Sequence, residues 1–120
     1  MMEAFAVLVV EDEPFQRMLA VDLVEEAGLI ALEARDADEA IAILESRNDI
    51  RVVFTDINMP GSMDGLRLAA AVRDRWPPVR IIVTSGNFEP AADELPAGSS
   101  FLSKPYDPRR LVEELRGLDL

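Results

Sequence analysis

Short runs of apolar residues alternate along this chain with segments in which apolar residues recur at helical spacing. A continuous, valine-rich apolar run suits a strand that is buried on both faces. The segments between the runs carry helix start signals, such as an aspartate cap or a proline at the first position. The apolar runs predict five strands, at residues 5–10, 29–34, 51–57, 80–84 and 99–103.

The first helix is predicted over residues 15–27, between the first two strands. Pro14 is suited to open it, because proline is tolerated at the first helical position, and Gly28 is suited to end it. The apolar positions of this segment are Phe15, Met18, Leu19, Leu23 and Ala27. Their spacing is that of an amphipathic helix with one apolar face.

The second helix is predicted over about 37–47. Asp36 is suited to cap its start, and Glu39 stands three residues later, as in an aspartate version of the capping box. The residues expected to be buried are Ala40, Ile41, Ile43 and Leu44.

Two more helices are predicted in the second half of the chain. Asp64 is suited to cap a helix over about 65–75, and Asp107 with Pro108 opens a last helix that runs to about 117. The inner face of that last helix is expected to carry Leu111, Val112 and Leu115.

Residues 86–98 interrupt the alternation. This stretch, GNFEPAADELPAG, contains two prolines and two glycines and has little periodic apolar content. A helix here is expected to be short, roughly 90–95, or irregular.

The alternation of strands and helices predicts an α/β fold. Repeated β-α units favour a parallel sheet with right-handed crossovers and helices on both faces, in three layers. A length of 120 residues fits one domain. In such doubly wound sheets, ligands bind at the carboxyl ends of the strands, where the strand order reverses.

Composition narrows the chemistry that this edge of the sheet could support. The net charge is −11 and the 12 basic residues are scattered, which argues against direct binding of nucleic acid. The chain has no histidine and no cysteine, which excludes imidazole bases, the usual catalytic triads and thiolate metal sites. A metal site must therefore use oxygen ligands, for which Mg²⁺ is the natural candidate and Mn²⁺ a second.

The sequence shows neither a membrane span nor a secretory leader. No apolar run approaches the ~20 residues needed to cross a bilayer. The amino-terminal residues lack the basic start and small-residue cleavage site of a signal peptide. With the absence of cysteine, this favours a cytoplasmic protein that does not associate with membranes.

Polar side chains stand where the predicted strands end. Glu11 and Asp12 follow the first strand, Asp56 ends the third, Ser85 follows the fourth and Lys104 follows the fifth. In a parallel sheet these ends share one edge, so three carboxylates, a hydroxyl and an ammonium would meet there. A divalent cation relieves the repulsion among carboxylates, and a carboxylate beside such an ion is a possible nucleophile toward phosphorus. Each residue alone is ordinary; their joint order along the chain carries the prediction.

Four segments of the sequence resemble the receiver domain of two-component response regulators, the group that includes the chemotaxis response regulator. The matching segments span essentially the whole chain. They are VLVVEDE at 7–13, VVFTDINMPGSMDG at 52–65, IIVTSG at 81–86 and SKPY at 103–106. The resemblance implies a flavodoxin-like (βα)5 fold with a five-stranded parallel sheet in the order 2-1-3-4-5.

The resemblance also implies roles for residues at the strand ends. Asp56 matches the phosphoacceptor, Asp12 the direct acidic ligand of Mg²⁺, and Glu11 its neighbour that acts through water. Asn58 matches the position whose backbone carbonyl completes the metal site. Lys104 matches the lysine that contacts the phosphoryl group.

Three further positions match residues of the family's switch. Ser85 matches the switch hydroxyl in preference to Thr84, and Phe101 matches the switch aromatic. Pro105 matches the position that often follows a cis peptide bond. Asn58 and Asn87, each two residues beyond a functional position, are expected to tune hydrolysis by steering water.

Three features depart from the common family pattern. The loop after Asp56 reads MPGSMDG, one residue longer than usual, and Phe101 lacks the hydroxyl of the frequent tyrosine. The largest departure is 86–98, where receivers place a fourth helix that belongs to their output surface.

The implied function is that of a phosphorylation switch. A sensor histidine kinase or a phosphotransfer protein would supply the phosphoryl group, and an unknown downstream protein would respond. Residues 1–120 are expected to form a single receiver domain without an effector domain, acting as a monomer or a weak phosphorylation-dependent dimer. Such a domain is not a conventional enzyme, since it catalyses only its own phosphorylation and dephosphorylation.

Other readings of the sequence remain open. One is a receiver-like binding module that signals without phosphorylation, and another is a receiver fragment of a hybrid histidine kinase. A metal-dependent phosphatase with an aspartyl-phosphate intermediate is less favoured. Such enzymes often carry a second aspartate two residues after the nucleophile, and Asn58 occupies that position here.

Overall fold

The computed structural model describes residues 5–59, 61, 63–86 and 89–118, and it shows five strands in one parallel sheet. The strands are β1 (Ala6–Val10), β2 (Ile30–Ala34), β3 (Ile50–Asp56), β4 (Arg80–Ser85) and β5 (Ser100–Ser103). They lie in the order β2-β1-β3-β4-β5. The predicted α/β class and strand order are confirmed, and every strand lies within one residue of its predicted bounds.

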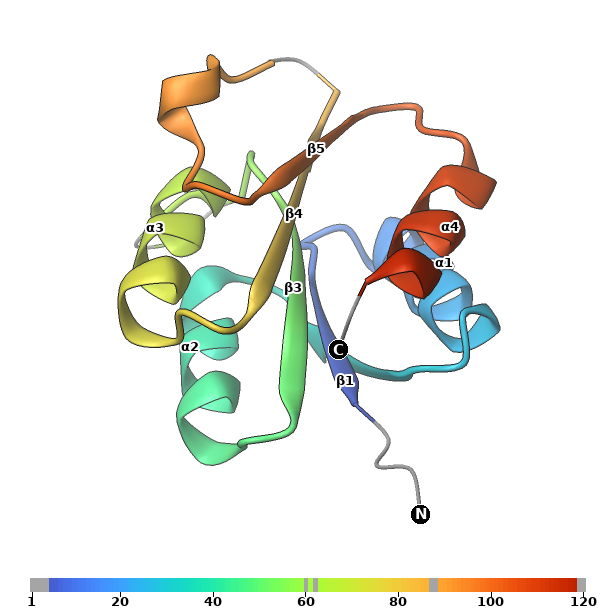
Figure 1. Cartoon of the computed structure of the whole chain (residues 1–120), viewed down its shortest axis with the longest axis horizontal. Helices are drawn as coiled ribbons and strands as arrows, with labels where there is room; N and C mark the ends of the chain where they lie inside the picture. The colour runs from blue at the N-terminus through green and yellow to red at the C-terminus, as the bar shows by residue number, and fades with distance from the viewer. Residues whose placement is uncertain (1–4, 60, 62, 87–88, 119–120) are drawn as a thin grey trace.

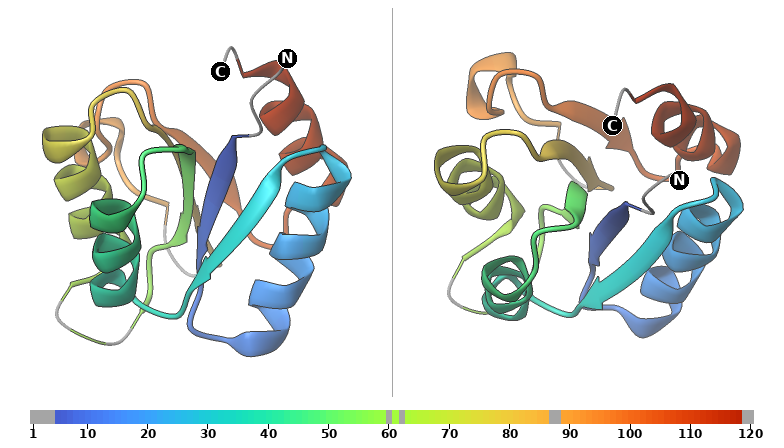
Figure 2. Two further views of the ribbon diagram at one scale, coloured as in Figure 1. Left: turned by 90° about the horizontal axis from the view of Figure 1, so that it is seen from below. Right: turned by 60° about the horizontal axis from the view of Figure 1, so that its bottom comes forward.

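Helices cover both faces of the sheet, which gives three layers (Figures 1 and 2). The helices α2 (Ala37–Ser46) and α3 (Gly65–Arg75) lie on one face, and α1 (Pro14–Glu26) and α4 (Pro108–Gly117) lie on the other. Two hydrophobic clusters fill the spaces between the layers. Leu8 and Val53 point toward α2 and α3, whereas Val7 and Val52 point toward α1 and α4. Successive side chains of one strand therefore pack into the hydrophobic clusters on opposite faces of the sheet.

Aspartate side chains cap the helices as predicted. Asp36 accepts a hydrogen bond from the Glu39 backbone N–H at 2.8 Å, and Asp64 accepts one from the Arg67 backbone N–H at 2.9 Å. Gly28 follows α1 with a φ of +87°, in the left-handed region where glycine carries no steric penalty.

The core face of α1 differs from the prediction. Phe15, Met18 and Leu19 are exposed, at 60%, 49% and 46% of their accessible surface, and the buried residues of the helix are Ala20 and Val24. Small and β-branched residues let α1 pack closely on the sheet, while its largest apolar side chains point outward. Of the five apolar positions predicted, Leu23 and Ala27 pack against the core, whereas the prediction was wrong for Phe15, Met18 and Leu19.

The inner faces of the other two predicted amphipathic helices are closer to expectation. Leu111, Val112 and Leu115 of α4 are all buried. In α2, Ala40 and Leu44 are buried as predicted. The two isoleucines, Ile41 and Ile43, are only partly buried at the rim of the core.

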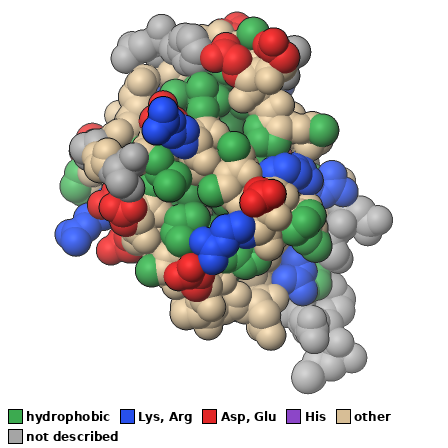
Figure 3. Space-filling view, turned by 90° about the vertical axis from the view of Figure 1, so that its left-hand side faces the viewer, with side chains coloured by type: hydrophobic (Ala, Val, Ile, Leu, Met, Phe, Trp, Pro, Cys, Tyr) green, Lys and Arg blue, Asp and Glu red, His purple; other side chains and the backbone are tan. Residues whose placement is uncertain are grey.

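The connection between β4 and β5 contains only a single 3₁₀ turn among its described residues, Ala92–Glu94. This agrees with the expectation of a short or irregular element in 86–98. Figure 3 shows the face of the molecule that α2 and α3 cover, where hydrophobic, basic and acidic side chains intermingle.

None of the helices among the described residues is long and apolar enough to cross a bilayer. Two residues of the loop after Asp56, at positions 60 and 62, lie outside the described residues, as does Asn87.

Candidate functional site

The carboxyl ends of four strands bring the predicted site residues to one edge of the sheet. β1 leads into Glu11 and Asp12, β3 ends at Asp56, β4 ends at Ser85, and β5 leads into Lys104. The central strands pair in register here, with Val10 beside Thr55 and Asp56 beside Thr84. Parallel pairing therefore gathers side chains that are far apart in the sequence.

Glu11, Asp12 and Asp56 form a group of carboxylates whose selected oxygens all lie within 4.8 Å of one another. Glu11 and Asp56 are buried, whereas Asp12 is exposed at the mouth of the site. Three hard oxygen donors at this spacing match the preference of Mg²⁺ for carboxylates and water, and the exposed member leaves room for water ligands. The residues present thus fit a magnesium ion.

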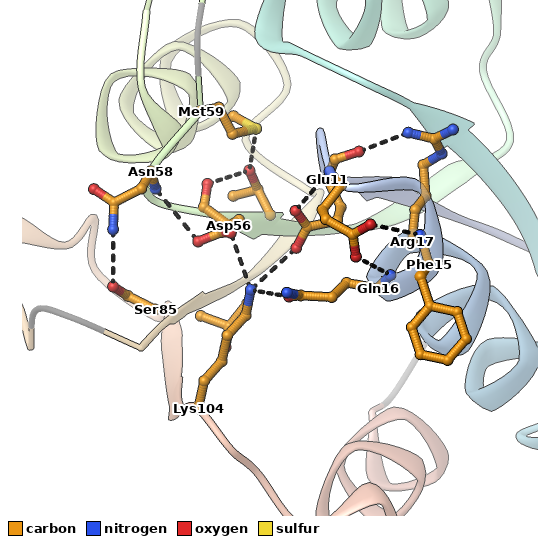
Figure 4. Close-up of polar contacts among 12 residues, drawn as sticks. Glu11, Phe15, Gln16, Arg17, Asp56, Asn58, Met59, Ser85 and Lys104 are labelled. Atoms are coloured by element: carbon orange, nitrogen blue, oxygen red, sulfur yellow. Dashed lines mark hydrogen bonds and ion pairs between the residues drawn. The ribbon is translucent and has the colours of Figure 1, made fainter.

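Lys104 crosses this edge and contacts two of the three carboxylates (Figure 4). Its Nζ donates to Asp56 Oδ2 at 3.0 Å and to Glu11 Oε1 at 3.1 Å. A third hydrogen bond, to Gln16 Oε1 at 2.6 Å, uses the last of its three N–H donors. The ammonium therefore neutralises charge between β1 and β3 while its backbone stays at the end of β5.

The protonation states of this pair follow from burial and from their contact. Burial raises the pKa of Glu11 above its ordinary value, although the Glu13 backbone N–H and Lys104 oppose that shift. Burial acts to lower the pKa of Lys104, but its hydrogen bonds with Asp56 and Glu11 outweigh that effect and the pKa is raised. Lys104 is therefore a fixed positive charge at neutral pH.

Asn58 links the acceptor loop to β4. Its backbone N–H donates to Asp56 Oδ1 at 3.3 Å, and its side-chain Nδ2 donates to Ser85 Oγ at 3.4 Å. Ser85 is 1% exposed. Thr84 instead donates its hydroxyl to the Leu102 carbonyl at 2.7 Å, within the sheet. Of the two hydroxyls that end β4, Ser85 is the one that reaches the loop of Asp56.

The structure also shows where Phe101 and Pro105 lie. Phe101 is partly buried and packs against the cluster on the α2 and α3 face of the sheet, paired in register with Val83. It does not join the polar contacts around Asp56. The peptide bond between Lys104 and Pro105 is cis, as the sequence resemblance implied.

Two residues with structural roles at the site had no role in the sequence prediction. Gly65 begins α3 so close to β3 that an added Cβ would lie 2.0 Å from the Asp56 carbonyl oxygen. The Gly65 N–H donates to the Ile57 carbonyl at 2.8 Å. Gln16 is the second, through its contact with Lys104. A glycine directly after a cap residue signalled the first, while nothing in the sequence signalled the second.

A cavity of about 630 Å³ adjoins the polar edge on the α1 side of the sheet. Its walls are mainly apolar and come from α1, the strands and the loop before α4. The residues lining it include Leu19, Leu23, Phe54, Tyr106, Lys104 and Gln16. Phe54 and Tyr106 meet edge to face there, with ring centroids 5.9 Å apart.

Comparison with known proteins places this geometry in a family. Residues 7–116 match the model of the response regulator receiver domain. The chain is 36% identical over 113 residues to the nitrogen assimilation regulatory protein NtrX of Azorhizobium caulinodans, covering 91% of the chain and 25% of NtrX. It is 34% identical to the chemotaxis protein CheY of Thermotoga maritima, covering 91% of the chain and 92% of CheY.

A solved structure with the same fold was determined in complex with Mg²⁺ and BeF. The response regulator TrrA of Thermotoga maritima, in complex with Mg²⁺ and BeF, superposes with a TM-score of 0.84 at 27% identity, covering 93% of this chain and 96% of TrrA. The chain spans a quarter or less of the length of the first four curated relatives it matches. By its sequence, its strand order and its acidic edge, the chain belongs to the response regulator receiver domain family of two-component signalling.

Proposed function

We propose that Asp56 accepts a phosphoryl group from the phosphohistidine of a sensor histidine kinase or phosphotransfer protein, in the presence of Mg²⁺, and that this switches the protein contacts of the domain. The observation that carries the proposal is the meeting of Glu11, Asp12 and Asp56 within 4.8 Å, with Lys104 Nζ 3.0 Å from the Asp56 carboxylate. TrrA, a relative with the same fold, binds Mg²⁺ and BeF.

Glu11, Asp12, Asp56 and the backbone carbonyl of Asn58 are the groups that would hold Mg²⁺. When bound, the ion neutralises negative charge on the transferring phosphoryl oxygens. Mn²⁺ offers the same oxygen preference. Because Glu11 is buried and hydrogen-bonded by the Glu13 N–H, its carboxylate is held in place before any ion arrives.

The transfer itself uses the side chains of this chain in defined roles. An Asp56 carboxylate oxygen attacks phosphorus, the phosphorus–nitrogen bond of phosphohistidine breaks, and the electron pair stays with the departing imidazole. Lys104 donates to a phosphoryl oxygen in place of its present bond to Asp56. Asn58 keeps the acceptor oriented through its backbone N–H. The product is an acyl phosphate on Asp56, which adds negative charge at the strand ends.

Ser85 and Phe101 form the proposed switch. The Ser85 hydroxyl, now bonded by Asn58, turns to donate to a phosphoryl oxygen. Phe101 then moves into the space that Ser85 leaves. This shifts the equilibrium between two conformations of the surface around β5. Hydrolysis of the acyl phosphate returns the domain to its first state, with Asn58 steering water.

The proposed output is protein–protein contact. All described elements of residues 1–120 belong to the receiver fold, which supports a single receiver domain as the signalling unit. Receiver domains are in general signalling modules and not enzymes. We therefore assign this domain its own phosphorylation and dephosphorylation and no other reaction.

Incubation with acetyl phosphate and Mg²⁺, followed by intact mass measurement, tests the acceptor. The wild type is expected to gain the mass of one phosphoryl group, and Asp56→Asn none. Asp107→Asn is a control, because Asp107 caps α4 outside the acidic group. An unmodified wild type that also fails to respond to fluoroberyllate would favour the phosphorylation-independent binding module instead.

A further inference from the structure

Gln16 makes the shortest hydrogen bond of Lys104, yet the proposed transfer gives it no role. Its Oε1 lies 2.6 Å from Lys104 Nζ, compared with 3.0 Å for Asp56 Oδ2 and 3.1 Å for Glu11 Oε1. Figure 4 shows the Gln16 side chain reaching from α1 to the end of Lys104. The bond joins two parts of the chain that lie 88 positions apart in the sequence.

Lys104 borders open space on one side. The side chain keeps 21% of its surface accessible, and it forms part of the wall of the 630 Å³ cavity beside the site. A lysine has a flexible four-carbon stem and a point charge at its tip. With open volume on one side, the position of its Nζ is set by its polar partners.

Two of those partners change their bonding in the proposed reaction. Asp56 becomes an acyl phosphate, and Glu11 belongs to the acidic group that would hold Mg²⁺. Gln16 is neutral, lies outside that group and is not altered by phosphoryl transfer. Among the three acceptors that Lys104 now contacts, it is the one that stays the same throughout.

The backbone of Gln16 is itself anchored. Its N–H donates to Glu13 Oε2 at 2.8 Å in the first turn of α1. Glu13 in turn donates its N–H to Glu11 Oε2 at 3.1 Å. The start of α1 is thus tied to the acidic edge, so the amide of Gln16 is presented from a defined position.

We propose that Gln16 is a positioning residue that holds the Lys104 ammonium where it meets the transferred phosphoryl group. This inference rests on the proposed function of Asp56. A neutral amide suits the task, because a carboxylate at the same place would add a fourth negative charge near an anionic ligand. A small displacement of the ammonium would weaken its stabilisation of the charge on the phosphoryl group, because that stabilisation depends on precise placement.

The test compares fluoroberyllate binding in the presence of Mg²⁺ by calorimetry and by ¹⁹F NMR. Gln16→Met keeps the length of the side chain and removes the acceptor. It is expected to weaken fluoroberyllate binding about five-fold, as for loss of a partly exposed hydrogen bond to a charged group. It should also shift the ¹⁹F resonance of the fluorine that Lys104 contacts, more than the others.

Met18→Gln is the matched control, since it makes the reverse exchange at an exposed position of the same helix. It should leave the affinity and the ¹⁹F spectrum unchanged. Because Gln16 is exposed, Gln16→Met should also unfold at the wild-type temperature. In a Lys104→Met background, Gln16→Met should have no further effect on affinity, because the two residues act together.

Equal affinity and an unchanged ¹⁹F spectrum for Gln16→Met would overturn the inference, as would an undiminished effect of Gln16→Met without Lys104. Either result leaves the phosphoacceptor role of Asp56 intact, provided that acetyl phosphate still modifies the wild type. A wild type that takes up neither reagent would instead refute the proposed function. The two failures are therefore distinguishable.

Discussion

The Asp56 edge and the connection after β4 are held in place by different kinds of contact. At the Asp56 edge, side chains from α1 and from the ends of β1, β3 and β5 meet, and Lys104 at the end of β5 contacts a residue from each of the other three elements. In the described part of 86–98, most hydrogen bonds are local. The backbone N–H of Glu94 donates to Ala91, and that of Ser99 donates to Pro96.

A side chain of α3 supplies a long-range hydrogen bond to the described part of that connection. Arg73 of α3 donates to the Ala97 carbonyl at 2.5 Å. It also donates to the Pro77 carbonyl at 3.0 Å, but that bond is local to the turn between α3 and β4. Leu95 adds a partly buried apolar contact with the core. Segments held mainly by local bonds open at lower free energy than segments held by several elements. The contrast teaches that the chemical site is fixed by the sheet, whereas the neighbouring surface is fixed by a few residues.

Among the substitutions that test this difference between the two regions, Gly65→Ala is expected to change stability most. The new Cβ would lie 2.0 Å from the Asp56 carbonyl oxygen and 2.7 Å from its carbonyl carbon, which are backbone atoms of a central strand. We expect a loss of about 3 kcal/mol in the free energy of unfolding, measured by chemical denaturation.

Gly117→Ala is the control for that substitution, because nothing lies within 4 Å of the added Cβ at the end of α4. It is expected to stabilise the protein by about 0.5–1 kcal/mol, through helix propensity and a less flexible unfolded chain. A loss below ~1 kcal/mol for Gly65→Ala would mean that the start of α3 can move away from β3, and that the acceptor loop is less fixed than its contacts indicate.

An intermediate effect is expected from Arg73→Ala. Removing its hydrogen bond to Ala97 of the connection, together with its local bond to Pro77, should cost about 1 kcal/mol in global stability. Its main signature should be faster amide hydrogen exchange at residues 94–99, with unchanged exchange in β1 and β3.

The control for Arg73 is Arg75→Ala on the same helix. Arg75 pairs with Glu45 at 2.6 Å and stacks on Trp76, with its guanidinium carbon 4.4 Å from the ring centroid. As a surface contact it should change stability by about 0.5 kcal/mol or less and leave exchange at 94–99 as in wild type. Equal hydrogen-exchange profiles for the two variants would show that Arg73 does not hold the connection after β4 in place.

The smallest effect concerns Tyr106, the single tyrosine of the chain, and appears only at alkaline pH. Burial in the cavity wall raises the pKa of Tyr106 above 10.0, against a smaller lowering by the Lys104 charge. Above pH 10 the unfolded chain therefore loses the phenolic proton before the folded one does. The stability contributed by this group is present below pH 10 and declines as the pH rises through the folded-state pKa.

Tyrosinate absorbance during an alkaline titration measures this shift, with the denatured protein as reference. Phe54→Leu should move the folded-state pKa back toward its ordinary value, because it removes the edge-to-face ring and admits water to the cavity wall. Native and denatured proteins that titrate together would show that Tyr106 is solvated, and that the cavity beside the site is open.

Local patterns predicted most of the architecture. The alternation of apolar runs and capped helices identified the five strands and four α-helices that the described residues form. Proline and glycine content identified 86–98 as irregular, and its described residues form one 3₁₀ turn. These features depend on backbone propensity and short-range hydrogen bonds, which neighbouring residues determine. The same patterns also placed Glu11, Asp12, Asp56, Ser85 and Lys104 at strand ends.

The sequence did not determine which faces and atoms meet. Phe15, Met18 and Leu19 have the spacing of a core face, but they are exposed, and the fully buried residues of α1 are Ala20 and Val24. The switch role of Phe101 stays a prediction, and the structure adds that its ring packs against the core on the α2 and α3 face.

By itself, therefore, the sequence determined the elements, their order and the polar residues at their ends. Only the tertiary structure decided that Gly65 must lack a side chain beside Asp56 and that Gln16 lies 2.6 Å from Lys104. The physical reason is the range of the interactions. Helix caps and strand patterns act over a few residues, whereas these contacts depend on how two elements, distant in sequence, approach each other on one sheet.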